Sequence, residues 1–259
     1  MQFTDSHCHL DFKEFSHNKE ALIQQCLDAG ISRIIIPGIT SKRWPRVLTL
    51  CQQYHHLYPA LGLHPWWIDK ATTADLQILE QHIQQDKLIA VGEIGIDGAI
   101  NDIAKQTLFF EHQLELAKQY QLPVIVHHRK SHHLILPILK RINSQQGGII
   151  HAFSGNMQQA KGYLDLGFKL GIGGTITYPR AKTTRQTVVK LPLESLVLET
   201  DAPAMPLYGF QGKDNSPMQL IRVFEQLATL RAEPKELIAR QIEANLNGLF
   251  SFDEPSSLT

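Results

Sequence analysis

The 259-residue sequence lacks the features that mark several common classes of protein. It has only three cysteines, Cys8, Cys26 and Cys51, and no C-x-x-C spacing, which excludes a disulfide framework and a zinc ribbon. No apolar run approaches the ~18 residues that a membrane span needs, and the first residues include neither a basic segment nor an apolar one. We therefore expect a protein of the reducing cytoplasm with no membrane association.

An excess of charge of one sign is also missing, because 25 Lys and Arg balance 25 Asp and Glu. A net charge of zero provides no global attraction to a polyanion, so a nucleic-acid substrate would need a local basic patch. Phosphate-binding loops of the G-x-G-x-x-G or G-x-x-x-x-G-K-[ST] kind are absent, and Gly171-Ile172-Gly173-Gly174 lacks their spacing. These absences count against a nucleotide-binding open sheet.

Short apolar, β-branched runs recur along the whole chain, and a stretch with helical spacing follows each of them. The predicted strands are residues 3–9, 32–38, 58–63, 88–94, 122–128, 148–152, 168–172 and 196–201. No Pro/Gly/Ser linker or low-complexity tract divides them. The pattern predicts the α/β class and a single (β/α)8 TIM barrel forming one domain over residues 1–259, with an open doubly wound sheet as the alternative.

Candidate ligands for a metal gather at the predicted strand ends, where a parallel barrel places its chemistry. The first strand ends in His7 and His9, which alternation along a strand places on one face. The fourth strand contains Glu93, and a buried carboxylate needs a partner, a hydrogen bond or a metal. The fifth, sixth and eighth strands end in His127, His151 and Asp201, with Glu199 on the same face as Asp201.

Together, His7, His9, Glu93, His127, His151 and Asp201 exceed what one tetrahedral zinc requires. They predict two divalent cations per chain, spaced about 3.5–4 Å apart, with Glu93 as the bridging carboxylate. Imidazole and carboxylate without thiolate suit Zn²⁺, Mn²⁺ or Mg²⁺.

The sequence resembles the TatD family of metal-dependent deoxyribonucleases, a branch of the amidohydrolase-like TIM barrels, and within it the YjjV-like subgroup. The segments that carry the resemblance are Asp5-Ser6-His7-Cys8-His9-Leu10, Gly62-Leu63-His64-Pro65, Val91-Gly92-Glu93-Ile94-Gly95-Ile96-Asp97, Leu122-Pro123-Val124-Ile125-Val126-His127, His151-Ala152-Phe153-Ser154-Gly155 and Leu198-Glu199-Thr200-Asp201-Ala202-Pro203. The sequence departs from the family pattern at Gly98, where an aromatic residue is common, and at Asp214-Asn215-Ser216-Pro217.

The resemblance implies that His7, His9 and Asp201 hold one metal, that His127 and His151 hold the second, and that Glu93 bridges them. The family's H-x-R pattern assigns the ligand to His127 rather than His128. The resemblance also implies hydrolysis of phosphodiester bonds in DNA, including processing of 3′ ends.

Other residues near the strand ends are candidates for contact with substrate. His64 is expected to bind substrate or to donate a proton to a leaving oxygen, with a packed loop histidine as the alternative. Arg129 is expected to bind a phosphate or to brace a carboxylate. Trp66 and Trp67 either stack on a base or simply pack at the rim.

The sequence thus predicts a hydrolase in which Asp201 positions and deprotonates a water and Glu93 bridges the metals. Its expected substrate is single-stranded or terminal nucleic acid, or a small phosphodiester, and no obligate protein partner is evident. Two alternatives remain open: a metal-dependent amidohydrolase or lactonase acting on a small cyclic amide or ester, and a non-catalytic, metal-stabilised binding protein.

Overall fold

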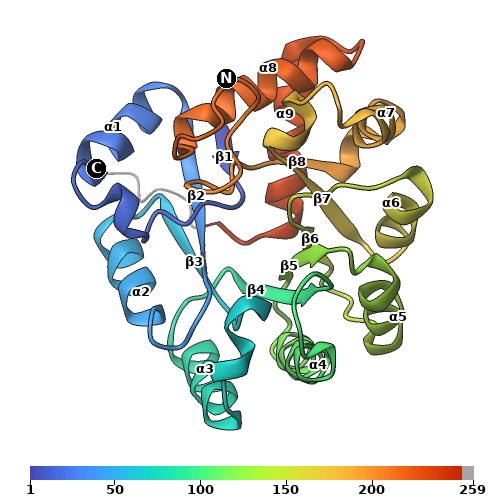
Figure 1. Ribbon diagram of the computed structural model, residues 1–259. Helices are drawn as coiled ribbons and strands as arrows, with labels where there is room; N and C mark the ends of the chain where they lie inside the picture. Colours follow the sequence, from blue (N-terminus) through green and yellow to red (C-terminus); the bar gives the residue numbers. More distant parts are fainter. Residues whose placement is uncertain (253–259) are drawn as a thin grey trace.

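Eight parallel strands form the centre of the computed structural model, which describes residues 1–252 (Figure 1). They are β1 (Phe3–Asp5), β2 (Ile31–Gly38), β3 (Leu57–Leu61), β4 (Ala90–Asp97), β5 (Val124–Arg129), β6 (Gly148–Ile150), β7 (Phe168–Ile172) and β8 (Leu196–Leu198). Each strand pairs with the next along the chain, and the Ser6 backbone N–H donates to the Leu198 carbonyl at 3.0 Å where β1 meets β8. This order confirms the (β/α)8 barrel and excludes the open doubly wound sheet, whose strand order reverses at a switch point.

Helices ring the barrel on the outside (Figure 1). They are α1 (Lys19–Asp28), α2 (Trp44–Gln53), α3 (Thr73–Gln85), α4 (Ile103–Gln119), α5 (His132–Ile142), α6 (Met157–Leu164), α7 (Lys182–Lys190), α8 (Leu220–Leu230) and α9 (Lys235–Leu249). Local sequence fixes several of their starts, since Thr72 and Asp75 form a capping box at α3, as do Asn156 and Gln159 at α6. No helix within residues 1–252 combines the length and the apolarity needed to cross a bilayer.

The predicted strands all occur, but the first, third, sixth and last end earlier than expected, so that His151 lies just beyond β6, whereas β4 and β5 extend to Asp97 and Arg129. β1 ends at Asp5 rather than at residue 9, and β8 ends at Leu198 rather than at residue 201. Beyond these points the two segments bond to each other: Asp201 N–H donates to the His7 carbonyl and His9 N–H donates to the Ala202 carbonyl, both at 2.8 Å. The expected domain also included residues 253–259, which lie outside the described residues.

The barrel interior has an apolar layer beneath the strand ends. Its buried side chains come from six strands, from the segment before β4 and from α9, and they are Ile35, Ala60, Ile89, Ala90, Ile125, Ile149, Val197, Leu246 and Phe250. Because side chains alternate along a strand, the next inward positions after Ile125 and Ile149 are His127 and His151. The apolar layer therefore lies directly below the polar side chains of the strand ends.

Candidate metal centre

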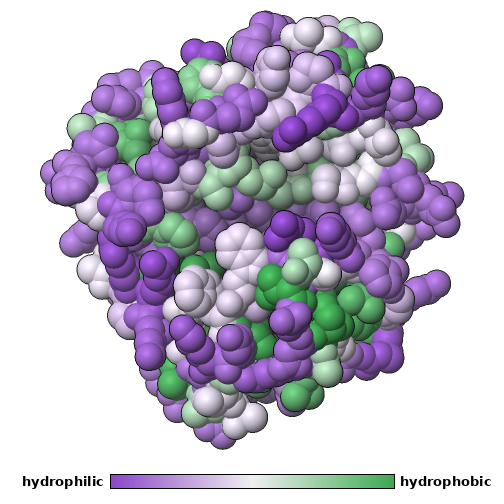
Figure 2. Space-filling model, viewed as in Figure 1, coloured by the Kyte–Doolittle hydropathy of each residue, from purple (hydrophilic) through white to green (hydrophobic). Residues whose placement is uncertain are grey.

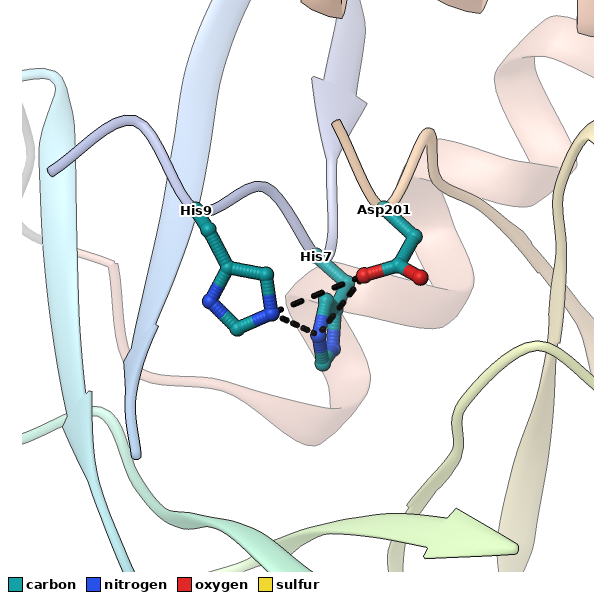
Figure 3. Close-up of side chains that lie close together, drawn as sticks. All are labelled: His7, His9 and Asp201. Atoms are coloured by element: carbon teal, nitrogen blue, oxygen red, sulfur yellow. Dashed lines mark hydrogen bonds and ion pairs between the residues drawn. The ribbon is translucent and has the colours of Figure 1, made fainter. Parts of the chain in front are cut away.

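His7, His9 and Asp201 converge inside the ring of strands, as Figure 3 shows. The two imidazole Nε2 atoms lie 3.3 Å apart, and Asp201 Oδ1 lies 3.6 Å from His7 Nε2 and 3.5 Å from His9 Nε2. The alternation expected along a continuous first strand does not bring them together, because both histidines lie beyond β1. Instead, the backbone bonds between residues 7–9 and 201–202 hold the three side chains in place.

The buried side chain of Glu93 stands between this group and two further histidines. Its Oε2 lies 3.3 Å from His7 Nε2 and 3.5 Å from His9 Nε2. Its Oε1 lies 3.0 Å from His127 Nδ1 and 3.9 Å from His151 Nε2. The structure thus brings all six predicted ligands together, with Glu93 in the middle; their role as ligands stays a prediction.

A second row of carboxylates stands behind two of the histidines. Glu199 Oε1 lies 3.0 Å from His151 Nδ1, and Asp97 Oδ2 lies 3.6 Å from His127 Nε2. Carboxylates in this position orient metal-binding imidazoles and raise their basicity. Sequence reasoning placed Glu199 near the site but assigned Asp97 no role, although both Asp97 and Glu93 occupy inward positions of β4, four residues apart.

His64, expected to contact substrate, lies deep in the cluster rather than at its rim. Its Nε2 is 3.2 Å from Glu93 Oε1, and the ring is buried. Its Nδ1 accepts a hydrogen bond from the backbone N–H of Trp66, so in the neutral ring the proton resides on Nε2. His64 therefore presents a donor to the cluster, not a lone pair, although it is also close enough to Glu93 and His127 to count as a potential ligand.

His9 has the opposite tautomer. Its Nδ1 lies 3.2 Å from the Pro37 carbonyl, which can only accept, so the proton resides on Nδ1. The Nε2 of the neutral ring then carries a lone pair that faces His7 and Asp201. This is the tautomer that a metal-binding histidine requires.

The electrostatics of the cluster favour a cation. Burial lowers the pKa of His151, but Glu199 and Asp201 outweigh that effect and raise it to about 10. Burial raises the pKa of Asp201 to about 6, with His151 and His9 opposing the shift. Burial also lowers the pKa of His64 to about 4, which keeps that ring neutral. Because the carboxylates hold a proton on His151, a divalent cation would compete with that proton.

The donor atoms present fit a divalent metal. Three sets each offer ligand atoms within 4.8 Å of one another, namely His7–His9–Asp201, His7–Glu93–His151 and His64–Glu93–His127. His127 Nε2 and Glu199 Oε2 are buried without a hydrogen-bond partner among residues 1–252. Nearby Cys8 adds no thiolate, because burial raises the pKa of its thiol well above the ordinary value. Imidazole and carboxylate are the ligands expected for zinc, manganese or magnesium.

Arg129 and Trp66 line the edge of the site, and Trp67 follows Trp66 in the sequence. The Arg129 side chain, at the end of β5, is 55% exposed, and its Nη1 lies 3.6 Å from Asp97 Oδ2. Trp66 and Trp67 belong to the short helical turn η2 (Pro65–Lys70) that follows β3 and are 54% and 40% exposed. Only Trp66 is tied to the cluster by a side-chain bond among the described residues, because its Nε1 donates to Asp97 Oδ2 at 2.6 Å.

Comparisons with known proteins agree with this architecture. The model of the family described as TatD related DNase matches residues 4–251. The uncharacterized metal-dependent hydrolase YjjV of Escherichia coli K12 is 46% identical over 254 residues, covering 96% of this chain and 98% of that protein. The crystal structure of YjjV, a TatD homolog from the same organism, superposes with a TM-score of 0.93 over 96% of this chain and 97% of that one.

A more distant relative has a more specific name. The 3′-5′ ssDNA/RNA exonuclease TatD of Salmonella typhimurium is 27% identical over 249 residues, covering 93% of this chain and 96% of that protein.

Proposed function

The chain belongs to the TatD related DNase family and is a metal-dependent hydrolase, and on that premise we propose that it hydrolyses phosphodiester bonds at the ends of single-stranded nucleic acid. The observation that carries the proposal is the position of Glu93, whose two carboxylate oxygens each face a different set of imidazoles. Such a carboxylate suits a pair of cations acting on one phosphate. The name of the Salmonella typhimurium relative supports the choice of substrate.

His7, His9 and Asp201 would hold one cation, His127 and His151 the other, and Glu93 would bridge them. The tautomer of His9 supports this assignment, since its Nε2 lone pair faces the cluster. When bound, divalent cations lower the pKa of water and offset negative charge on phosphoryl oxygens. Zinc, manganese and magnesium are all compatible with these donors.

Asp201 is the carboxylate best placed to hold the attacking water. Its side chain is 13% exposed, whereas those of Glu93, Glu199 and Asp97 are 3%, 1% and 0% exposed. Solvent therefore reaches Asp201 more readily than the other three. In this proposal Asp201 orients the water and accepts its proton.

His64 would act at the leaving oxygen. Its Nδ1 accepts from Trp66 N–H, so the N–H that can donate a hydrogen bond lies on Nε2, the nitrogen that faces Glu93 and the cluster. Neutral imidazole can stabilise a leaving oxygen as a hydrogen-bond donor without becoming charged first.

Cationic side chains on the loops after the strands are available to pair with the phosphates of a nucleic acid. They are Lys13, Lys42, Arg43, Lys70, Lys130, Arg180 and Lys213, together with Arg129 at the end of β5. The same loops also carry Glu14, Asp69, Asp102 and Asp214, as well as Asp11, Glu199 and Asp201, so acidic and basic side chains nearly balance and a positive excess at the mouth depends on bound cations. The surface around the centre of this face is mixed, with hydrophilic side chains among neutral and apolar ones (Figure 2). A short strand entering the mouth is thus favoured over a long duplex lying across it.

A substrate panel tests the proposal. The metal-loaded protein is assayed on end-labelled single-stranded DNA and RNA, a closed circular duplex, a small phosphodiester, and several cyclic amides and lactones. We expect shortening of the single strands that weakens as salt rises and stops on chelation. Turnover confined to the cyclic amides or lactones would instead show that the protein is an amidohydrolase or a lactonase. Metal binding without any turnover would indicate a binding protein.

A further inference from the structure

Trp66 is both exposed and fixed in position. The residue is 54% exposed to solvent. Its indole Nε1–H nevertheless donates a hydrogen bond to the fully buried carboxylate of Asp97 at 2.6 Å. A buried carboxylate requires compensating hydrogen bonds, and the Trp66 indole supplies one of those that Asp97 accepts. The bond removes rotational freedom from a large aromatic surface that remains open to solvent.

The fixed indole borders the proposed catalytic cluster. Its ring centroid lies 5.2 Å from that of His64 and 6.2 Å from that of His127, with interplanar angles of 85° and 72°. The ring thus stands beside two histidines of the cluster, one of which is the proposed donor to the leaving oxygen. A planar group stacked on this indole would therefore lie beside the proposed donor to the leaving oxygen.

The carboxylate of Asp97 also pairs with the guanidinium of Arg129. Arg129 Nη1 lies 3.6 Å from Asp97 Oδ2, the oxygen that accepts from Trp66, and the Arg129 side chain is 55% exposed. Asp97 itself is rigidly placed, because its Oδ1 accepts from Ala99 N–H and its backbone N–H donates to Gln106 Oε1, both at 2.8 Å. Asp97 Oδ2 therefore holds both the Trp66 indole and the Arg129 guanidinium close to itself.

We propose that Trp66 and Arg129 form a nucleotide grip, in which the terminal base stacks on the Trp66 indole and its phosphate pairs with Arg129. Asp97 is the positioning residue that holds both side chains. This inference rests on the proposed hydrolysis of single-stranded ends and adds the subsite that captures the end. The Trp66 indole would recognise a base by its π-face. The grip would therefore accept all four bases and discriminate against an abasic nucleotide.

Steady-state kinetics on two matched oligonucleotides test the grip. One carries a normal terminal nucleotide, and the other carries an abasic residue at the same end. In Trp66→Leu we expect KM for the normal strand to rise roughly 10-fold at nearly unchanged kcat, the scale of one lost base stack. For the abasic strand, the KM of Trp66→Leu should equal the KM of the wild type on that same strand. The matched control is Trp67→Leu, because Trp67 is 40% exposed and, within residues 1–252, its side chain forms no hydrogen bond or ring contact with the cluster. Equal KM shifts for both strands, or none, would overturn the grip.

Trp66→Phe isolates the part played by Asp97. Phenylalanine keeps a stacking ring but lacks the N–H that bonds to Asp97. If that bond positions the ring, KM for the normal strand should lie between those of the wild type and Trp66→Leu. A wild-type KM in Trp66→Phe would remove the positioning role of Asp97.

Tryptophan fluorescence provides a readout that needs no turnover. Deoxyadenosine monophosphate should quench emission of the wild type and of Trp67→Leu but not of Trp66→Leu, in which only Trp67 and the buried Trp44 remain. Deoxyribose 5-phosphate should quench none of the three. A wild type that cleaves neither oligonucleotide would refute the proposed function, and this assay would still decide the grip: quenching that depends on Trp66 supports it, and absence of quenching overturns it.

Discussion

The inside of the barrel has a lower layer of apolar side chains and an upper layer of polar ones. Along a strand, a single outward-facing residue separates the two layers. Ile125, Ile149 and Val197 belong to the apolar layer, and two residues later along the same strands or just beyond them stand His127, His151 and Glu199. Burying a large aliphatic side chain stabilises the fold by about 1.5–3 kcal/mol. Crowding carboxylates and imidazoles in a buried site instead opposes folding unless partners compensate for it.

Stability and chemistry therefore depend on different levels of the same strands. Leu246 of α9 and Phe250, directly after α9, pack against the lower level and cover it with apolar side chains. The upper level stays open at Asp201. Substitutions in the two layers should therefore have separable effects on turnover and on unfolding.

The largest effect is expected in the upper layer, from Asp201→Asn. The amide keeps the shape of the side chain but cannot accept a proton, and loss of a general base lowers rates by roughly 10²–10⁴-fold. Weaker metal binding would add to the loss. Turnover at saturating metal and the unfolding midpoint are measured together, with Asp214→Asn, an exposed carboxylate of the same loop, as control. Wild-type rates in Asp201→Asn would remove Asp201 from the mechanism.

The next effect should appear in the lower layer, from Ile149→Ala. This change leaves a cavity beneath the cluster and should lower the free energy of unfolding by about 2–5 kcal/mol. The residual activity per folded molecule should remain close to that of the wild type. Ile78→Ala, the same substitution at a position that is 39% exposed on α3, should change stability by at most about 0.5 kcal/mol. If Ile149→Ala abolished turnover while the protein stayed fully folded, the two layers would not be separable.

A smaller effect is expected from Glu199→Gln, behind the upper layer. Glu199 lies 3.0 Å from His151 Nδ1 and accepts from Ala152 N–H at 2.6 Å, so it orients the imidazole without facing the substrate. Loss of such a carboxylate reduces metal affinity or activity by roughly 10–100-fold. Titration of activity against metal concentration measures the effect, with the exposed Glu194→Gln as control. A loss as large as that of Asp201→Asn would place Glu199 in direct contact with the chemistry.

Much of this arrangement could be predicted because it depends on local rules. Periodicity located every strand, and the rule that chemistry lies at strand ends selected Glu93, His127 and His151. Contacts between distant segments could not be predicted in this way. The turns after β1 and β8 depend on hydrogen bonds between residues nearly 200 positions apart, such as Asp201 N–H to the His7 carbonyl.

The same limit explains the residues whose placement was unexpected. His64 reaches Glu93 because the η2 turn redirects the chain after β3, which no periodicity indicates. Asp97 gains its importance from Trp66 and Arg129, which come from two other segments of the barrel. Only the assembled fold brings those groups to one oxygen atom.

The central claim is that the upper layer holds divalent cations, and metal stoichiometry tests it most directly. Protein purified without added metal is stripped with chelator, titrated with zinc, manganese or magnesium, and analysed for bound metal and for hydrolysis at each step. We expect saturation at two ions per chain, with activity lost on stripping and regained on titration. Saturation below one ion per chain by all three metals would contradict it.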